Sequence, residues 1–267
     1  MIGAILGDIV GSIYEFDNIK TKDFKLFDKE CMFTDDSVMT IAVAEALMQF
    51  EHSNKENINV FKEKLITIMH EIGYKYPYCG YGGHFLGWIL HNKREPYNSF
   101  GNGSAMRVSP VGWYAETLEK AEMIAKATAE VTHNHPEGIK GAVATAGAVF
   151  LARSGADMDE IKKYIAQYYT IDFTLDEIRP TYKFDVTCQG TVPQAMQAFF
   201  ESESFEDAIR NAISIGGDSD TLATITGAVA EAYYGIDEDM KETALSYLDE
   251  RLLDITKRFE KKYLKLL

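Results

Sequence analysis

The sequence predicts an all-α protein with one domain over residues 1–267, and three observations support this fold class. Apolar residues recur every three or four positions through most of the chain, which is typical of helices with one buried face. The alternation expected of strands is scarce, and only residues 184–187 (Phe-Asp-Val-Thr) show it, weakly. No linker-like tract, internal repeat or low-complexity block divides the chain. Typical helix lengths then predict about ten or more helices.

The first predicted helix carries three glycines on one face. Gly3, Gly7 and Gly11 follow one another at four-residue spacing, so they would line a single side of the helix. A phosphate-binding loop is the alternative, but its Gly-Lys-Ser/Thr ending is missing. We therefore predict that another backbone packs closely against this face, because glycine has no side chain to keep it away.

The later helices are predicted from apolar stripes and from signals at their ends. Pro136 suits the first position of one helix, and Gly235 suits the end of another. The polar Thr128 interrupts the stripe of a third. The stripes are Val38, Ile41, Ala42 and Ala46; Ala121, Ile124, Ala125 and Val131; Ile139, Ala142, Val143, Ala146 and Val149; Phe205, Ala208, Ile209 and Ala212; Leu222, Ile225, Val229 and Ala232; and Leu252, Phe259, Tyr263 and Leu266.

Four long stretches lack such a stripe and are predicted to be irregular. They are residues 17–33, 74–83, 93–103 and 172–187. Long loops inside a domain often carry function, so these segments are candidates for the walls of a site.

The composition limits the classes of function. The formal net charge is −14, from 41 acidic and 27 basic residues. A surface this acidic disfavours non-specific nucleic-acid binding and docking on anionic membranes. The cysteines Cys31, Cys79 and Cys188 form no zinc or disulfide pattern. The N-terminus has no signal-peptide pattern and no apolar run is long enough to span a membrane, so we expect a soluble, cytoplasmic protein.

Two acidic motifs precede predicted helices and offer oxygen ligands. Residues 34–37 read Thr-Asp-Asp-Ser, and residues 216–221 read Gly-Gly-Asp-Ser-Asp-Thr. Each is also explained as a helix cap, which requires only one such residue. Adjacent carboxylates repel one another unless a cation lies between them, and oxygen ligands suit Mg²⁺, Mn²⁺ or Ca²⁺ rather than Zn²⁺. Together the motifs predict two helix starts that face each other across a site for two divalent cations.

Two further motifs are candidates for substrate contacts. Residues 101–107 read Gly-Asn-Gly-Ser-Ala-Met-Arg, and a turn of small residues can present free backbone N–H groups to phosphate oxygens. A plain Asn-Gly turn explains the same residues. His133 and His135 flank Asn134, but no third strong zinc ligand is evident nearby. We therefore expect a histidine near the substrate rather than a metal ligand.

The motifs taken in order resemble those of ADP-ribosylglycohydrolases, which include the dinitrogenase-reductase-activating glycohydrolases of bacteria. The resemblance runs from residue 2 to about residue 236, and the combination is highly specific. It is carried by Gly7, Asp8 and Glu15, then by residues 34–37, 101–107, 132–135 and 217–221.

The resemblance implies an orthogonal all-α fold with a dinuclear Mg²⁺ or Mn²⁺ site. One metal would be bound by Thr34, Asp35 and Asp36, the other by Asp218 and Thr221, and both by Asp220. The diphosphate and distal ribose would be held by Gly101, Asn102, Gly103 and Ser104, with His133 on the substrate side and Gly80, Gly82 and Gly83 lining the cleft. Glu15 would lie near the second metal and the substrate ribose.

The implied function is hydrolysis of the glycosidic bond between ADP-ribose and a protein side chain or small conjugate. Glu15, Asp36 and Asp220 are the candidate catalytic residues. Glu15 is the best uncommitted carboxylate for proton transfer, and its neighbours Tyr14 and Phe16 would partly exclude water from it. Arginine, serine, a base and a free small molecule all remain open as leaving groups.

Two other functions are compatible with these motifs. A two-metal phosphoesterase would bind its cations through the same oxygen atoms, and a non-catalytic module would bind ADP-ribose without cleaving it. A two-metal phosphoesterase acting on a nucleotide usually recruits histidines beside its carboxylates, and no His-Asp dipeptide occurs in the chain. A non-catalytic ADP-ribose-binding module would tolerate the loss of a metal aspartate or of Glu15, yet all of these residues are present.

Overall fold

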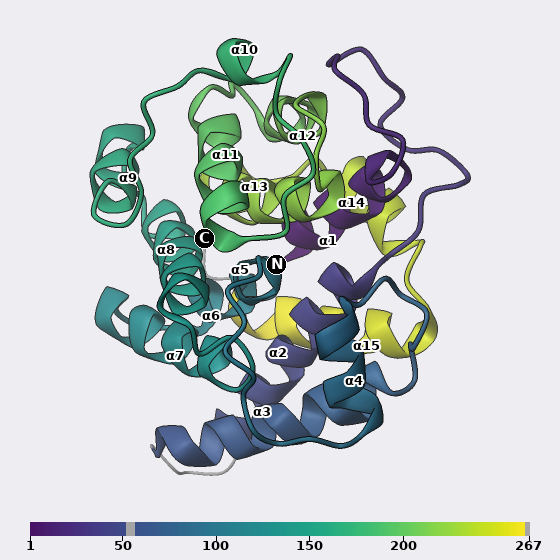
Figure 1. Cartoon of the computed structure of the whole chain (residues 1–267), viewed down its shortest axis with the longest axis vertical. Coiled ribbons are helices and arrows are strands. Elements are labelled where there is room, and N and C mark those ends of the chain that lie inside the picture. The colour runs from purple at the N-terminus through teal and green to yellow at the C-terminus, as the bar shows by residue number, and fades with distance from the viewer. Residues whose placement is uncertain (52–56, 265–267) are drawn as a thin grey trace.

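The computed structural model describes residues 1–51 and 57–264, and it confirms the predicted all-α class (Figure 1). These residues form fifteen α-helices, a short 3₁₀ helix η1 (Ser12–Tyr14) and a terminal π-helix η2 (Glu260–Leu264). The α-helices are α1 (Ile2–Gly11), α2 (Asp35–Glu51), α3 (Ile58–Gly73), α4 (Gly83–Leu90), α5 (Gly103–Met106), α6 (Ser109–Tyr114), α7 (Leu118–Glu130), α8 (Pro136–Arg153), α9 (Met158–Ile165), α10 (Leu175–Ile178), α11 (Cys188–Phe200), α12 (Phe205–Ser214), α13 (Ser219–Tyr234), α14 (Glu238–Leu245) and α15 (Glu250–Phe259).

Most helix ends follow the local signals in the sequence. Pro136 opens α8, and α13 ends before Gly235, whose φ of +77° favours glycine. The polar Thr128 is accommodated in buried surroundings because its hydroxyl donates to the Ala125 carbonyl at 2.7 Å. Val131 lies just past the end of α7, and Leu266 lies outside the described residues.

Two expectations about irregular segments change. Residues 172–187 contain the short helix α10, which Thr174 and Glu177 stabilise through a capping box. No strand occurs within residues 1–51 and 57–264, and the weak strand signal at residues 184–187 corresponds to one isolated bridge between Gly101 and Thr187.

The centre of the molecule is the pair α1 and α13, which lie side by side (Figure 1). Every residue of α1 is buried. A Cβ placed on Gly7 would lie 2.1 Å from the carbonyl oxygen of Ala223, and one on Gly11 would lie 2.4 Å from the Cα of Asp220. Gly3 makes the same kind of close approach. The predicted close packing of this face is confirmed, and it brings the carboxyl end of α1 next to the start of α13.

The glycine face yields a test of the fold. Gly7→Ala should lower the free energy of unfolding by about 3 kcal/mol or more, because the new methyl group meets backbone rather than a flexible side chain. The matched control is Gly87→Ala in α4, where the new methyl group meets no atom within 4 Å. Urea unfolding should show this control to be neutral or more stable than the wild type. Equal stability of both variants would contradict the close approach.

The other helices surround this pair. α11 and α12 pack on one side of α13, while α2 packs against α1 and also against α3 and α15 (Figure 1). The starts of α2 and α13 therefore reach the same region beside α1. None of the helices within the described ranges combines the length and the apolar character needed to cross a membrane.

Candidate active site

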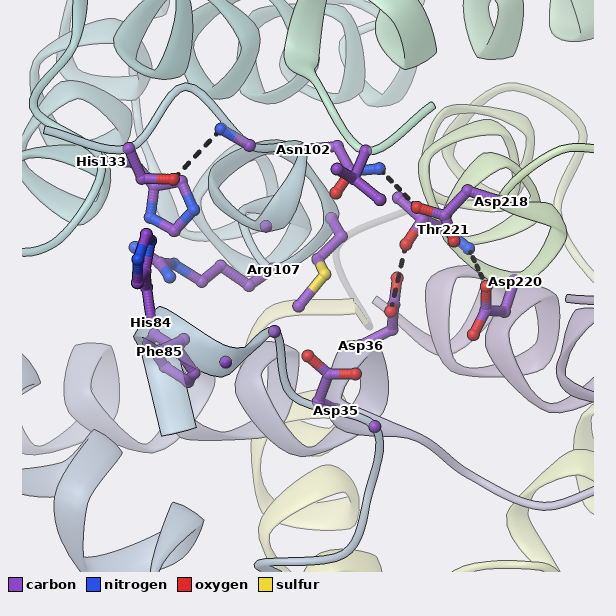
Figure 2. A pocket seen from close by; sticks show the side chains of 18 of the residues that line it. Asp35, Asp36, His84, Phe85, Asn102, Arg107, His133, Asp218, Asp220 and Thr221 are labelled. Carbon is purple, nitrogen blue, oxygen red and sulfur yellow. Dashed lines mark hydrogen bonds between the residues drawn. The ribbon is translucent and has the colours of Figure 1, made fainter. Parts of the chain in front are cut away.

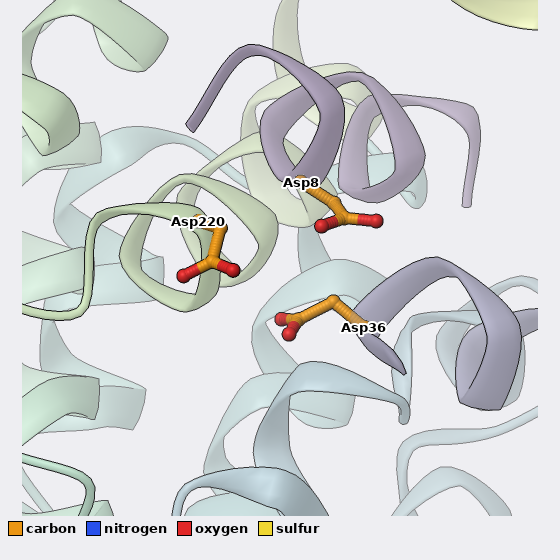
Figure 3. A group of neighbouring side chains, drawn as sticks. All are labelled: Asp8, Asp36 and Asp220. Carbon is orange, nitrogen blue, oxygen red and sulfur yellow. The ribbon is translucent and has the colours of Figure 1, made fainter. Parts of the chain in front are cut away.

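Acidic side chains from three helices meet where α1, α2 and α13 converge. Asp8, Asp36 and Asp220 each offer a carboxylate oxygen within 4.8 Å of the others, and all three are buried (Figure 3). The Thr221 hydroxyl donates to Asp36 Oδ2 at 3.3 Å, which links the two acidic motifs directly. The two helix starts thus face each other, as their sequences predict.

A second acidic group adjoins the first. Glu15, Asp218 and Asp220 each offer an oxygen within 4.8 Å of the others, so Asp220 belongs to both groups. This shared position is what a residue between two cations requires. The glycines that precede it, Gly216 and Gly217, have φ values of +67° and +82°, which favour glycine and allow the sharp turn into α13.

Asp8 is a member of the site to which the sequence analysis assigns no role. Its carboxylate accepts hydrogen bonds from the backbone N–H groups of Thr34 and Ser37, at 2.9 and 3.1 Å. It also accepts from both of their hydroxyls, at 2.5 Å from Thr34 Oγ1. Asp8 therefore fixes the start of α2. The available signal was an acid inside the otherwise apolar sequence of α1, since a buried acid needs partners.

The electrostatics of the cluster favour a proton or a cation among these acids. Burial, reinforced by the charges of neighbouring carboxylates, raises the pKa of Asp35, Asp36 and Asp220 well above the ordinary value. Burial also raises the pKa of Asp8 and of Asp218 to about 6. No ion pair in the described part of the chain involves these acids, and Asp36 Oδ1 is buried without a hydrogen-bond partner.

Glu15 lies directly after η1, half-buried in the pocket wall. Burial, and then the charges of Asp220 and Asp8, raise the pKa of Glu15 to about 8. The expected aromatic shield is incomplete, because Phe16 is 85% exposed and stacks on Phe184 at 6.1 Å between ring centroids. The raised pKa of Glu15 is therefore explained by burial and neighbouring acids, without a complete aromatic shield.

Asn18 holds the Glu15 segment against the start of α13. Its amide group donates to the carbonyls of Glu15 and Gly217, both at 2.9 Å, and to that of Tyr14 at 2.7 Å. Its side-chain oxygen accepts from the Gly217 N–H at 2.7 Å. Nothing in the local sequence indicates this role, because Gly217 lies 199 positions from Asn18 in the chain.

One end of a cavity of about 400 Å³ is lined by Asp35, Asp36, Asp218 and Asp220, whereas Asp8 does not line it (Figure 2). Most of the predicted site residues line it. They are Glu15, Asp35, Asp36, Gly80, Gly82, Gly83, Gly101, Asn102, Gly103, His133, Asp218, Asp220 and Thr221. Thr34 and Ser104 do not, since Thr34 bonds to Asp8 and the Ser104 hydroxyl donates to the Gly138 carbonyl at 2.7 Å.

The loop at residues 101–103 differs from its prediction in one respect. The backbone N–H of Gly101 donates to Ser99 Oγ at 3.1 Å, and that of Asn102 donates to the Val186 carbonyl at 2.8 Å. These two N–H groups are therefore not free for a ligand. The Asn102 side chain instead donates to Asp218 Oδ2 at 2.7 Å, so this loop is coupled to the acidic cluster.

The two histidines of the loop before α8 separate in space. His133 is buried and lines the cavity, whereas His135 accepts from the Glu137 N–H and caps α8. Neither belongs to a group of potential metal ligands within the described residues. This arrangement is the one expected of a substrate-side histidine at position 133.

Comparison with known proteins identifies the family to which this site belongs. The family model described as ADP-ribosylglycohydrolase matches residues 1–265. The chain belongs to the ADP-ribosylglycohydrolase family. A solved structure of an ADP-ribosylglycohydrolase-related protein complex has the same fold, with a TM-score of 0.68 and 20% identity; the match covers 97% of this chain and 96% of that one.

Curated relatives carry the same enzymatic description. Human ADP-ribosylhydrolase ARH3 is 25% identical over 318 residues, covering 89% of this chain and 85% of its own length. ADP-ribosylarginine hydrolase Tri1 of Pseudomonas putida (strain GB-1) is 25% identical, covering 88% of this chain and 70% of its own. The predicted family and hydrolase class are confirmed, while the phosphoesterase alternative finds no support in these comparisons.

Metal should stabilise this ADP-ribosylglycohydrolase increasingly as the pH rises. In the unfolded chain, carboxyl groups lose their protons above about pH 4. In the folded protein without metal, Asp8, Glu15 and Asp218 keep their protons to a higher pH, because their pKa values are raised. Stability of the metal-free protein therefore falls as the pH rises through about 6 to about 8. A bound cation replaces the protons on the aspartates that would bind it. The Mg²⁺-induced rise in melting temperature should grow from about pH 5.5 to about pH 8.

The control for this measurement is Asp220→Asn, which removes the carboxylate shared by both acidic groups. Its melting temperature should respond little to Mg²⁺ at either pH. A metal effect in the wild type that is equal at both pH values, or larger at the lower one, would count against the proton–metal exchange.

Proposed function

We propose that this protein is a dinuclear-metal-dependent hydrolase that cleaves the glycosidic bond between ADP-ribose and an acceptor. The acceptor is a protein side chain or the group of a small conjugate. We also propose that residues 1–267 form one functional unit. The observation that carries the proposal is the meeting of two acidic groups at the buried Asp220, the second of which includes the half-buried Glu15.

The donor set fits two hard cations. All candidate ligand atoms are oxygens, which suit hard cations. Asp36 Oδ1 is buried without a hydrogen-bond partner, so it is available to bind a cation. Thr34 and Thr221 each donate their hydroxyl hydrogen to a carboxylate, which leaves oxygen lone pairs for a metal. We assign Thr34, Asp35 and Asp36 to one Mg²⁺ or Mn²⁺, Asp218 and Thr221 to the other, and Asp220 to both.

The residues of the chain then have distinct tasks. When bound, the two cations would polarise and orient a water molecule and the ribose hydroxyls. Glu15 is assigned to neither cation, and burial raises the pKa of its carboxyl group to about 8 in the metal-free protein. Its carboxyl group is therefore the candidate to exchange a proton as the glycosidic bond breaks. Asp8 keeps the start of α2 in place, and Asn18 does the same for Glu15.

A product assay tests the proposal and its rivals together. The protein and Mg²⁺ would be incubated in parallel with ADP-ribosylated arginine, ADP-ribosylated serine and ADP-ribosylated nucleic acid. Release of ADP-ribose from at least one substrate is expected, and loss of that release in Asp220→Asn assigns it to this site. Release of AMP instead would indicate a phosphoesterase. Binding of ADP-ribose without release of any product would indicate a binding module.

A further inference from the structure

The cavity has a second end, which the proposed metal chemistry leaves without a role. The acids occupy one end, and the side chains of Arg107 and His133 lie at the other, next to His84 (Figure 2). Arg107 follows α5, and His133 stands in the loop before α8. Both side chains are buried, with exposed fractions of 1% and 5%.

Arg107 brings a positive charge to this end without a protein counter-charge. Its Nη2 atom donates to the Thr128 carbonyl and to Thr132 Oγ1, each at 2.8 Å. Its Nε atom has no hydrogen-bond partner, and no carboxylate in residues 1–51 or 57–264 forms an ion pair with it. Burial lowers the pKa of Arg107 to about 10, so the group stays charged at neutral pH. A buried unpaired cation is unfavourable unless a ligand supplies the missing negative charge.

Thr132 connects this charge to the His133 ring. Its Oγ1 atom lies 2.7 Å from His133 Nδ1 and already accepts a hydrogen from Arg107. The Thr132 hydroxyl is buried, so its hydrogen needs an acceptor within the protein, and His133 Nδ1 is within hydrogen-bond distance. If Nδ1 carried a hydrogen instead, the threonine hydrogen would lack a partner among the described residues. The hydrogen-bond chain therefore assigns the proton of the neutral ring to Nε2.

The Nε2 atom faces the glycine loop. A Cβ placed on Gly103 would lie 3.2 Å from this nitrogen, and one on Gly101 would lie 3.5 Å from it. No described residue pairs with Nε2, and His133 lines the cavity. Burial, and then the charge of Arg107, lower the pKa of His133 well below its ordinary value. The Tyr97 ring packs against the His133 ring, and the His84 ring packs against Tyr97. Neither side chain supplies a negative charge, since burial raises the pKa of Tyr97.

We infer that Arg107 and Thr132 are positioning residues that hold His133 as the neutral tautomer with its proton on Nε2. The Nε2 hydrogen is then a donor at the end of the cavity where the family resemblance already implies the diphosphate. The diphosphate belongs to the proposed function, and its contact with the Nε2 hydrogen rests on that function. The tautomer does not, because the hydrogen bonds that fix it lie within the protein.

The tautomer is directly measurable. The chain has six histidines, so a long-range ¹H–¹⁵N spectrum of histidine-labelled protein at neutral pH is simple to assign, with His133→Gln locating the signals of His133. The wild type should show a neutral ring with a hydrogen on Nε2. Thr132→Val, which keeps the shape and removes the hydroxyl, should produce a mixture of tautomers, and Thr132→Ser should restore the single form. A wild-type ring protonated on Nδ1 or on both nitrogens would overturn the inference, even if the valine variant failed to fold.

The ligand class is tested on the same spectra. With Mg²⁺ present, ADP should move the His133 Nε2 signals, whereas adenosine, which lacks the anionic group, should leave them in place. Thr132→Val should weaken ADP binding about tenfold by calorimetry, as expected for one hydrogen bond to a charged group. Equal shifts with adenosine, or no shift with ADP, would overturn the anion assignment. Failure of the glycohydrolase assay alone would leave the tautomer result standing and would remove only the diphosphate assignment.

Discussion

Exhaustive chelation should abolish hydrolysis, and added Mg²⁺ or Mn²⁺ should restore it. The reason is the concentration of buried acids at one point, where Asp8, Asp36 and Asp220 share a space of a few ångströms. Without cations, burial and the charges of neighbouring carboxylates raise the pKa of Asp36 and Asp220 well above the ordinary value, which favours protons on these two groups. A protonated cluster lacks the positive charge of the cations that would polarise the water molecule and the ribose hydroxyls. The measurement is the rate of ADP-ribose release after dialysis against a chelator, and again after each metal is added.

Controls for this experiment separate loss of metal from loss of fold. Circular dichroism of the chelated protein should still show a helical chain, since the close contacts of Gly3, Gly7 and Gly11 with α13 involve no proposed metal ligand except Asp220. Ca²⁺, another oxygen-binding cation, shows whether restoration depends on the identity of the metal. Full activity of a protein shown to be free of metal would refute the dinuclear assignment.

Glu15→Gln should lower turnover on the order of 10²-fold or more, as for general acid–base groups. Glu15 lies beside Asp218 and Asp220, and burial raises its pKa to about 8 in the metal-free protein, which suits a group that exchanges a proton near neutral pH. Glutamine keeps the size and the hydrogen-bonding capacity of the side chain but cannot transfer a proton. Binding of ADP-ribose, measured by calorimetry with Mg²⁺, should fall far less than turnover.

The matched control is Asp17→Asn, which removes an exposed acid two positions away. It should retain the turnover of the wild type, because the Asp17 side chain does not line the cavity. Near-normal turnover of Glu15→Gln would show that the carboxyl group is not catalytic. An equal loss of binding and turnover would instead make Glu15 a ligand of the substrate or of a metal.

Features that depend on neighbouring residues could be predicted well. The helical class follows from three- and four-residue apolar spacing, and the acidic helix starts follow from motifs within six consecutive residues. The glycine face of α1 also predicted a close helix contact, since only a neighbouring backbone can use the space that a missing Cβ leaves. The family resemblance then connected these motifs in order, and the family is confirmed.

Within the site, the sequence motifs predicted which segments line the cavity better than they predicted the hydrogen-bond partners of individual residues. Ser104 has the expected position in the chain, yet its hydroxyl bonds to α8 and does not line the cavity. The N–H groups of Gly101 and Asn102 look free in the sequence, but Ser99 and the Val186 carbonyl use them. These partners depend on where distant loops fold, which no local pattern records.

The sequence by itself determined the all-α class, the family and the two acidic helix starts, because each of these is encoded in residues close together in the chain. Only the tertiary structure decided that Asp8 fixes the start of α2, that Asn18 holds Glu15, and that Arg107 reaches His133 through Thr132. The contacts of Asp8 with α2 and of Arg107 with Thr132 join residues 25 or more positions apart, and Asn18 connects the Glu15 segment to Gly217, 199 positions away. Their distances are set by how closely helices pack, above all by α1 against α13. Burial at the same junctions sets the carboxyl pKa values, and burial is a property of the folded chain alone.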